Sequence, residues 1–103
     1  MRRLFVLLYD DALGTRQELQ MAINATAPIV LEWRFDLPNS FFLISEATAK
    51  TIAEAIRFRR PNGRFVVLEA GGDYWGWDHP ETWHMFQNKA ILETPAPTNQ
   101  IPT

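Results

Sequence analysis

The feature that most constrains the fold is an unbroken apolar run near the start of the chain, at residues 4–9. Every side chain in it is aliphatic or aromatic, so no position is suited to face water. A strand with one wet face alternates polar and apolar residues, whereas a continuous apolar run is typical of a strand buried on both faces. We therefore expect residues 4–9 to form a central strand of a sheet.

A helix is expected next, from a cap at Thr15 to about residue 25. Thr15 and Glu18 have the spacing of a capping box, in which each side chain bonds the backbone of the other residue. Leu19, Ala22 and Ile23 follow at the i, i+3, i+4 spacing of a single apolar helix face. Pro28 prevents the helix from continuing, because proline cannot donate the backbone hydrogen bond that a helix interior needs.

Residues 31–44 predict an antiparallel hairpin. Apolar and charged residues alternate strictly over 31–37, which indicates a half-exposed strand at the edge of the sheet. Pro38 and Asn39 supply turn chemistry, and the apolar residues 41–44 predict a second doubly buried strand.

The second half of the domain repeats the pattern of helix and strand. Thr48 caps an expected helix over residues 49–59, Pro61 ends it, and residues 64–69 predict the fourth strand. The order is therefore β-α-β-β-α-β. With right-handed crossovers this order gives an α+β fold, the ferredoxin-like β-α-β-β-α-β sandwich.

One face of such a sheet has no helix to cover it, although its strands are apolar on both sides. Leaving Phe5 or Phe42 exposed would forfeit roughly 4 kcal/mol each as an upper bound. We expect the face to be covered by an aromatic C-terminal extension carrying Trp75, Trp77 and Trp83, by a second subunit, or by both. These five residues are the predicted dimer or sheet-covering set.

The domain is expected to span residues 1–92, and residues 93–103 to be a disordered tail, because that segment lacks core-forming residues. A short helix is expected to open at Pro80 within the extension, capped by Asp78 or His79. A chain of 103 residues has material for one core.

The composition excludes several classes of protein. The chain has no cysteine, which excludes a disulfide framework and a thiolate metal site. Its formal net charge of −2 argues against a protein that coats duplex DNA through bulk charge. The apolar run at the N-terminus is too short for a signal peptide and no stretch approaches a membrane span, so we expect a soluble, cytoplasmic protein with no membrane partner.

Three segments carry a resemblance to a known superfamily. They are LLYD at residues 7–10, Thr48 at the start of the second helix, and EAGGDYWGW at 69–77 continued by PETW at 80–83. Over residues 3–89 the chain resembles the SinR-like group within the superfamily of the CRISPR-adaptation nuclease and virulence-associated protein D.

The resemblance implies a ferredoxin-like homodimer whose sheet faces meet. In the nucleases of the superfamily, the aspartate that ends the first strand lies at the dimer cleft and helps to hold a divalent metal ion. Asp10 occupies that position here. The chain departs from the pattern in having a second acid, Asp11, and a long loop after Asp36.

Asp10 and Asp11 are therefore the candidate metal ligands, with Mg²⁺ as the ion and Asp10 as the catalytic ligand. The competing interpretation is structural: two acids at a strand end can cap the following turn through bonds to its backbone N–H groups.

Other candidates have a structural interpretation that is favoured over the functional one. Arg57, Arg59 and Arg60 are candidate nucleic-acid contacts, but cations also complement the negative end of a helix dipole. His79 and His84, with acids nearby, suggest a metal site, but their spacing of five does not place them on one helix face.

Two functions from different classes stay open. The first is a dimeric, nucleic-acid-directed protein of the adaptation-nuclease type, a metal-dependent ribonuclease or other endonuclease acting in defence or as part of a toxin-antitoxin pair. The second is a non-catalytic protein-interaction module, for example a phage or mobile-element accessory factor or inhibitor. The sequence does not decide whether the chain is an enzyme.

Overall fold

The computed structural model describes residues 1–71 and 73–89. They form a compact α+β domain with a four-stranded antiparallel sheet and three α-helices. The elements in chain order are β1 (Arg3–Tyr9), the 3₁₀ turn η1 (Asp11–Leu13), α1 (Arg16–Ala25), β2 (Val30–Arg34), β3 (Ser40–Ser45), α2 (Ala49–Arg59), β4 (Phe65–Glu69) and α3 (Pro80–Asn88). The predicted tail at residues 93–103 lies outside the described residues.

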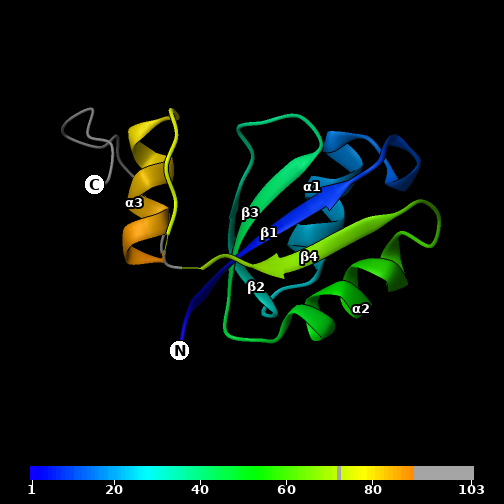
Figure 1. Ribbon diagram of the computed structural model, residues 1–103. Coiled ribbons are helices and arrows are strands. Elements are labelled where there is room, and N and C mark those ends of the chain that lie inside the picture. The colour runs from blue at the N-terminus through cyan, green and yellow to red at the C-terminus, as the bar shows by residue number, and fades with distance from the viewer. Residues whose placement is uncertain (72, 90–103) are drawn as a thin grey trace.

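The strands lie side by side in the order β2-β3-β1-β4, and every neighbouring pair is antiparallel. β1 is central, as its apolar run predicts. Helices α1 and α2 lie together along the sheet, while α3 stands apart at the other end (Figure 1). Within the described residues, no helix is both long enough and apolar enough to cross a membrane.

Local sequence signals set the ends of both long helices. Thr15 and Glu18 form the predicted capping box at the start of α1, with both reciprocal bonds present. Thr48 accepts from the backbone N–H of Thr51 and caps α2. β2 is shorter than predicted: it ends at Arg34 and not at residue 37. The alternating residues 35–37 therefore lie in the connection to β3.

The main core lies between the sheet and the pair α1 and α2. It contains Phe5, Leu7, Leu13, Leu19, Ile23, Val30, Phe41, Leu43, Ile52 and Ile56. Phe5 corrects a prediction: it was expected on the face without helices, but it is 1% exposed beneath them. Successive residues of a strand point to opposite faces, so Phe5 points toward the helices and its neighbours Leu4 and Val6 point away.

A second, smaller core lies on the opposite face of the sheet. Leu4, Ile44, Trp83, Met85 and Phe86 are buried there, with Phe42, Ala70 and Tyr74 packed against them. The rings of Phe42 and Phe86 meet edge to face, with centroids 5.0 Å apart. The extension therefore covers part of this face, and it does so through helix α3.

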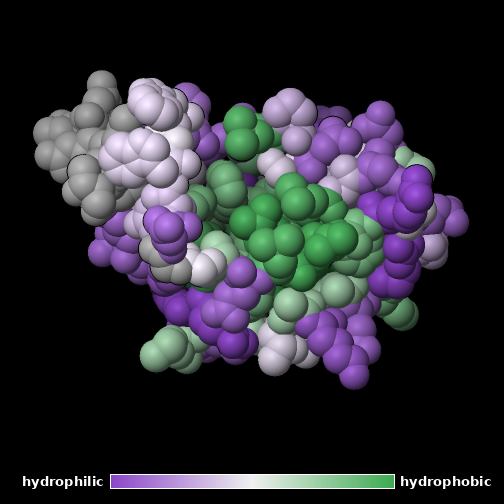
Figure 2. Space-filling model, viewed as in Figure 1, coloured by the Kyte–Doolittle hydropathy of each residue, from purple (hydrophilic) through white to green (hydrophobic). Residues whose placement is uncertain are grey.

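The rest of that face is open. Val6 and Leu8 of β1 lie opposite Leu68 and Val66 of β4, and these four residues define the open patch. Leu8 is 46%, Val66 57% and Leu68 42% exposed, and Val6 is half-buried. Figure 2 shows the apolar surface at the centre of this side of the molecule. Within the single chain, β1 is therefore not buried on both faces along its whole length, contrary to the expectation from its apolar run.

The three tryptophans of the extension behave differently from one another. Trp83 is buried against the sheet, as predicted. Trp75 and Trp77 do not cover the sheet, since they are 56% and 80% exposed. They precede α3 in an extended segment, where half-buried Tyr74, Gly76 and Asp78 alternate with them and the two indoles therefore point outward.

Candidate functional site

Asp10, the predicted metal ligand, caps the 3₁₀ turn that follows β1. Its Oδ1 accepts hydrogen bonds from the backbone N–H groups of Leu13 (3.2 Å) and Arg64 (3.0 Å). The Arg64 guanidinium lies 3.5 Å from Oδ2. The bond from the Arg64 backbone, more than any other influence, holds the pKa of Asp10 below its usual value. The structural interpretation of this residue thus has direct geometric support.

Asp11 faces a different partner. Its Oδ1 accepts from the side-chain amide of Asn39 at 3.0 Å, and the same amide donates to the backbone carbonyl of Tyr9. Asn39 thus ties the loop between β2 and β3 to the end of β1. The two neighbouring acids bind separate parts of the protein, and neither belongs to a group of three potential metal ligands among the described residues.

The three arginines at the end of α2 hold backbone carbonyls of their own chain. Arg57 donates to the carbonyls of Arg60 (3.1 Å) and Gly63 (2.7 Å), Arg59 to that of Ala25 (3.0 Å), and Arg60 to that of Leu13 (2.9 Å). Arg60 also pairs with Glu18 at 3.4 Å. These contacts join the loop after α2 to η1 and α1, so the arginines have a structural role.

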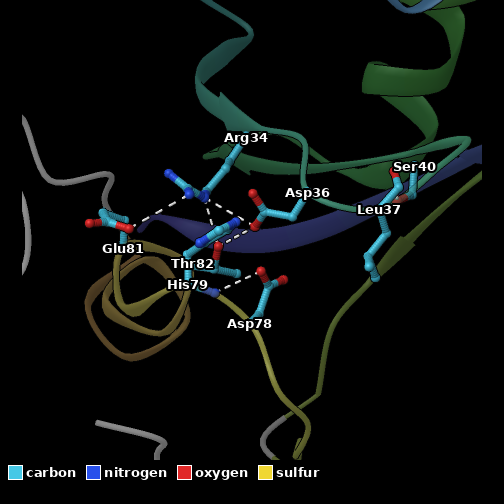
Figure 3. Close-up of polar contacts among 8 residues, drawn as sticks. All are labelled: Arg34, Asp36, Leu37, Ser40, Asp78, His79, Glu81 and Thr82. Atoms are coloured by element: carbon cyan, nitrogen blue, oxygen red, sulfur yellow. Dashed lines mark hydrogen bonds and ion pairs between the residues drawn. The ribbon is translucent and has the colours of Figure 1, made fainter. Parts of the chain in front are cut away.

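A different group of residues has the composition of a metal site. Asp36, Asp78 and His79, called here the carboxylate cluster, each offer one ligand atom, and these atoms all lie within 4.8 Å of one another. Asp36 comes from the β2–β3 loop, whereas Asp78 and His79 lead into α3. Figure 3 shows the three side chains beside one another between the sheet and the start of that helix.

Polar neighbours fix the position of Asp36. Its Oδ2 accepts from the Arg34 Nε at 3.1 Å and from the hydroxyl of Thr82, a buried residue of α3. Arg34 also pairs with Glu81 at 3.7 Å. The Asp36 side chain is only 5% exposed, so these bonds hold it in place at the junction of sheet and helix (Figure 3).

The negative charge of the Asp78 carboxylate is less well compensated than that of Asp36. Its Oδ1 accepts from the backbone N–H of His79 at 2.7 Å. Burial, and after it the nearby carboxylate of Asp36, raises the pKa of Asp78 above its usual value. Two carboxylates this close repel one another unless a proton or a cation lies between them.

Sequence reasoning identified only part of this cluster. It considered His79 and His84, with acids nearby, as candidate ligands, but the structure places the ring of His84 beside Asn88 on α3. Asp36 was predicted to face water on an alternating strand. One signal was available: in the alternation over residues 31–37, Asp36 lies on the side opposite Trp33 and Phe35, and α3 contacts that side through Thr82.

Beside the open patch lies a shallow hollow of about 340 Å³ at the end of β1. It is lined by Leu8, Tyr9, Asp10, Arg64, Phe65 and Val66. Asp10 and Arg64 thus form a charged rim at one end of the patch. Arg3 and Glu69, paired at 3.3 Å, form a second charged pair near its other end.

Comparison with known proteins leaves the family open. No family model, no curated protein and no solved structure matches this chain. The resemblance to the SinR-like group therefore stays a prediction from the sequence, resting on the segments around Asp10, Thr48 and residues 69–83.

Proposed function

We propose that this chain is a ferredoxin-like homodimer that works as a non-catalytic protein-interaction module, with the open patch as its self-association surface. The element order β-α-β-β-α-β and the strand order β2-β3-β1-β4 support the fold assignment. The exposure of the open patch is the observation that carries the proposal.

The open patch has the properties of an interface between two copies. Its side chains are aliphatic, contiguous across two strands and continuous with the buried cluster under α3. Burying a fully exposed side chain of this kind yields about 1.5–3 kcal/mol, and these residues are about half-exposed. Each would therefore contribute roughly half of that range when covered by a second copy. Contiguous apolar surface rimmed by polar and charged residues often marks a protein-interaction site.

The charges around the patch suit a two-fold arrangement. Arg64 precedes β4 and its side chain is 95% exposed, while Glu69 ends β4 and is 47% exposed. In a symmetric dimer with the two β4 strands antiparallel, Arg64 of each copy comes near Glu69 of the other. Opposite charges at the rim favour this pairing over a parallel one.

The non-catalytic part of the proposal rests on the contacts of the predicted catalytic residues. Both carboxylate oxygens of Asp10 face donors of the protein itself, and Arg57, Arg59 and Arg60 hold backbone carbonyls. These groups stabilise the corner where β1, η1 and α2 meet.

Light scattering on the full chain tests the self-association surface. We expect the wild type at micromolar concentration to have twice the 11.9 kDa mass of one chain. Leu8→Lys places a charge in the open patch and should return the mass to that of one chain. Met21→Lys is the matched control, because Met21 is an exposed apolar residue (72%) of α1, outside the patch. A wild type with the mass of a single chain contradicts the proposal.

A metal-dependent endonuclease is the second candidate, because Asp10 and Arg64 line the hollow at the rim of the patch. A dimer formed through the patch would bring two such hollows to one interface. The test is cleavage of single-stranded RNA and double-stranded DNA with Mg²⁺ or Mn²⁺. Cleavage by the wild type that is lost in Asp10→Asn and in chelator would establish this function and displace the non-catalytic module.

A further inference from the structure

We propose that Asp36, Asp78 and His79 bind one divalent transition-metal ion, Zn²⁺ being the ion that fits their donor set. This site is separate from Asp10 and Asp11, and none of its residues belongs to the open patch. It goes beyond the proposed function, since a metal site here is compatible with a monomer or a dimer.

The donor atoms carry the choice of ion. Zn²⁺ binds both carboxylate oxygens and imidazole nitrogens, and the imidazole favours Zn²⁺ over Mg²⁺ or Ca²⁺, which prefer oxygen ligands alone. Three protein ligands leave one position of a tetrahedral ion open. Zn²⁺ bonds of about 2.1 Å place tetrahedral donors roughly 3.4 Å apart. The three ligand atoms already lie within 4.8 Å of one another, so small side-chain rotations bring them to that spacing.

The charge around the cluster points to a cation independently of the spacing. Asp36 and Asp78 are neighbouring carboxylates, and Arg34 pairs with Asp36 at 3.1 Å. Asp78 instead accepts from the backbone N–H of His79 and lies beside the Asp36 carboxylate. A divalent ion would balance the negative charge of the two carboxylates at the half-buried end, beside Asp78.

The position of the cluster gives the ion a structural effect. Asp36 belongs to the loop after β2, whereas Asp78 and His79 immediately precede α3. One direct polar link between loop and helix is the bond from the Thr82 hydroxyl to Asp36. An ion held by all three ligands would join the same two segments, and so fasten α3 and its apolar side chains to the sheet.

The fourth coordination position would face solvent, since His79 is exposed and Asp78 is half-buried. The ion would therefore keep a water molecule or accept an oxygen ligand from a partner molecule. This arrangement differs from a closed structural zinc site with four protein ligands.

Calorimetric titration of the EDTA-treated full chain with Zn²⁺ tests the proposal. We expect one ion per chain, and a Tm that rises by about 5 °C or more when Zn²⁺ exceeds its Kd a hundredfold. Asp78→Asn and His79→Gln should each weaken binding at least about tenfold, as loss of a metal contact does. His84→Gln is the matched control, because His84 lies on α3 and outside the cluster. This variant should bind Zn²⁺ as the wild type does.

The Asp78→Asn variant distinguishes a metal site from the alternative, in which Asp36 and Asp78 share a proton. Asparagine removes the repulsion between the two carboxylates while it can still accept the backbone bond from His79. The metal-free variant should therefore melt at or above the Tm of the metal-free wild type, and it should lose most of the response to Zn²⁺. Co²⁺ in place of Zn²⁺ should give visible absorption bands that His79→Gln alters and His84→Gln leaves unchanged.

Two results would overturn the proposal. One is an absence of stoichiometric Zn²⁺ binding by the wild type, which would mean that a proton shared by Asp36 and Asp78 relieves their repulsion. The other is equal Zn²⁺ binding by the wild type, Asp78→Asn and His79→Gln. Leu8→Lys should bind Zn²⁺ normally, so the metal site and the self-association surface succeed or fail separately.

Discussion

At the scale of single residues, Gly63 shows how closely the corner around Asp10 is packed. Its φ is +89°, and a Cβ at this position would lie 2.3 Å from the backbone nitrogen of Leu13. Its carbonyl also accepts the 2.7 Å bond from Arg57. The loop after α2 thus packs directly against η1, and only glycine fits there.

Gly63→Ala should therefore destabilise the chain by more than about 1 kcal/mol, because the new methyl group meets backbone in a conformation that alanine avoids. Urea unfolding gives the measurement. Gly71→Ala is the control, since nothing in the described part of the chain lies within 4 Å of a Cβ at that position. Equal midpoints for the two variants would show that the loop can move away from η1.

The capping role of Asp10 has a consequence for acid stability. A carboxylate whose pKa is lowered by folding stabilises the folded state at pH values above its usual pKa of 3.8, and that contribution is lost as pH falls through the lowered value. Asn at this position caps but does not titrate. Between pH 7 and pH values below 3.8, Asp10→Asn should therefore lose less stability than the wild type loses. Parallel declines of the urea midpoint would contradict the role assigned to Asp10.

At the scale of elements, the sequence correctly predicted the features that depend on residues close together in the chain. The caps at Thr15 and Thr48 and the starts of all three helices follow from short-range chemistry. The sequence predicted an apolar second face but did not decide how much of β4 the extension covers, because an apolar run has the same composition whether or not another segment covers it. The place of Asp36 in the carboxylate cluster was missed for a similar reason: Asp36 and Asp78 are brought together only when α3 docks on the sheet.

The stability of the chain should depend strongly on Trp83, which packs α3 on the sheet, and hardly at all on Trp77. Trp83 is 6% exposed and packs on Tyr74 and Phe86, with ring centroids 6.0 and 5.5 Å away. Trp83→Ala should cost about 3–5 kcal/mol, as large-to-small core changes do. Trp77 is 80% exposed, so Trp77→Ala should change stability by no more than about 0.5 kcal/mol in the single chain.

Comparison of these two variants in the Leu8→Lys background keeps self-association out of the measurement. A large loss for Trp77→Ala in that background would show that the indole is buried. A loss that occurs only without Leu8→Lys would instead place Trp77 at the interface between two copies.

At the scale of the whole molecule, the sheet separates two apolar clusters of unequal size. One face is covered by α1 and α2, whereas, among the described residues, α3 covers the other over Leu4, Phe42 and Ile44. The helix is nine residues long, about 13 Å at the usual rise of 1.5 Å per residue. This length leaves the end of β1 and the whole of β4 open, which is the surface that a second copy is proposed to cover.

If folding is coupled to self-association, the Tm of the wild type should rise with chain concentration, because mass action favours the dimer. A hundredfold increase in concentration favours the dimer by about 2.7 kcal/mol per mole of dimer, which for a chain of this size is a rise of several degrees. Leu8→Lys should melt at a Tm independent of concentration, while Met21→Lys should follow the wild type. The slope of Tm against concentration thus shows whether the open patch mediates self-association in solution. A flat slope for the wild type would mean that the four aliphatic residues of the patch stay exposed to water.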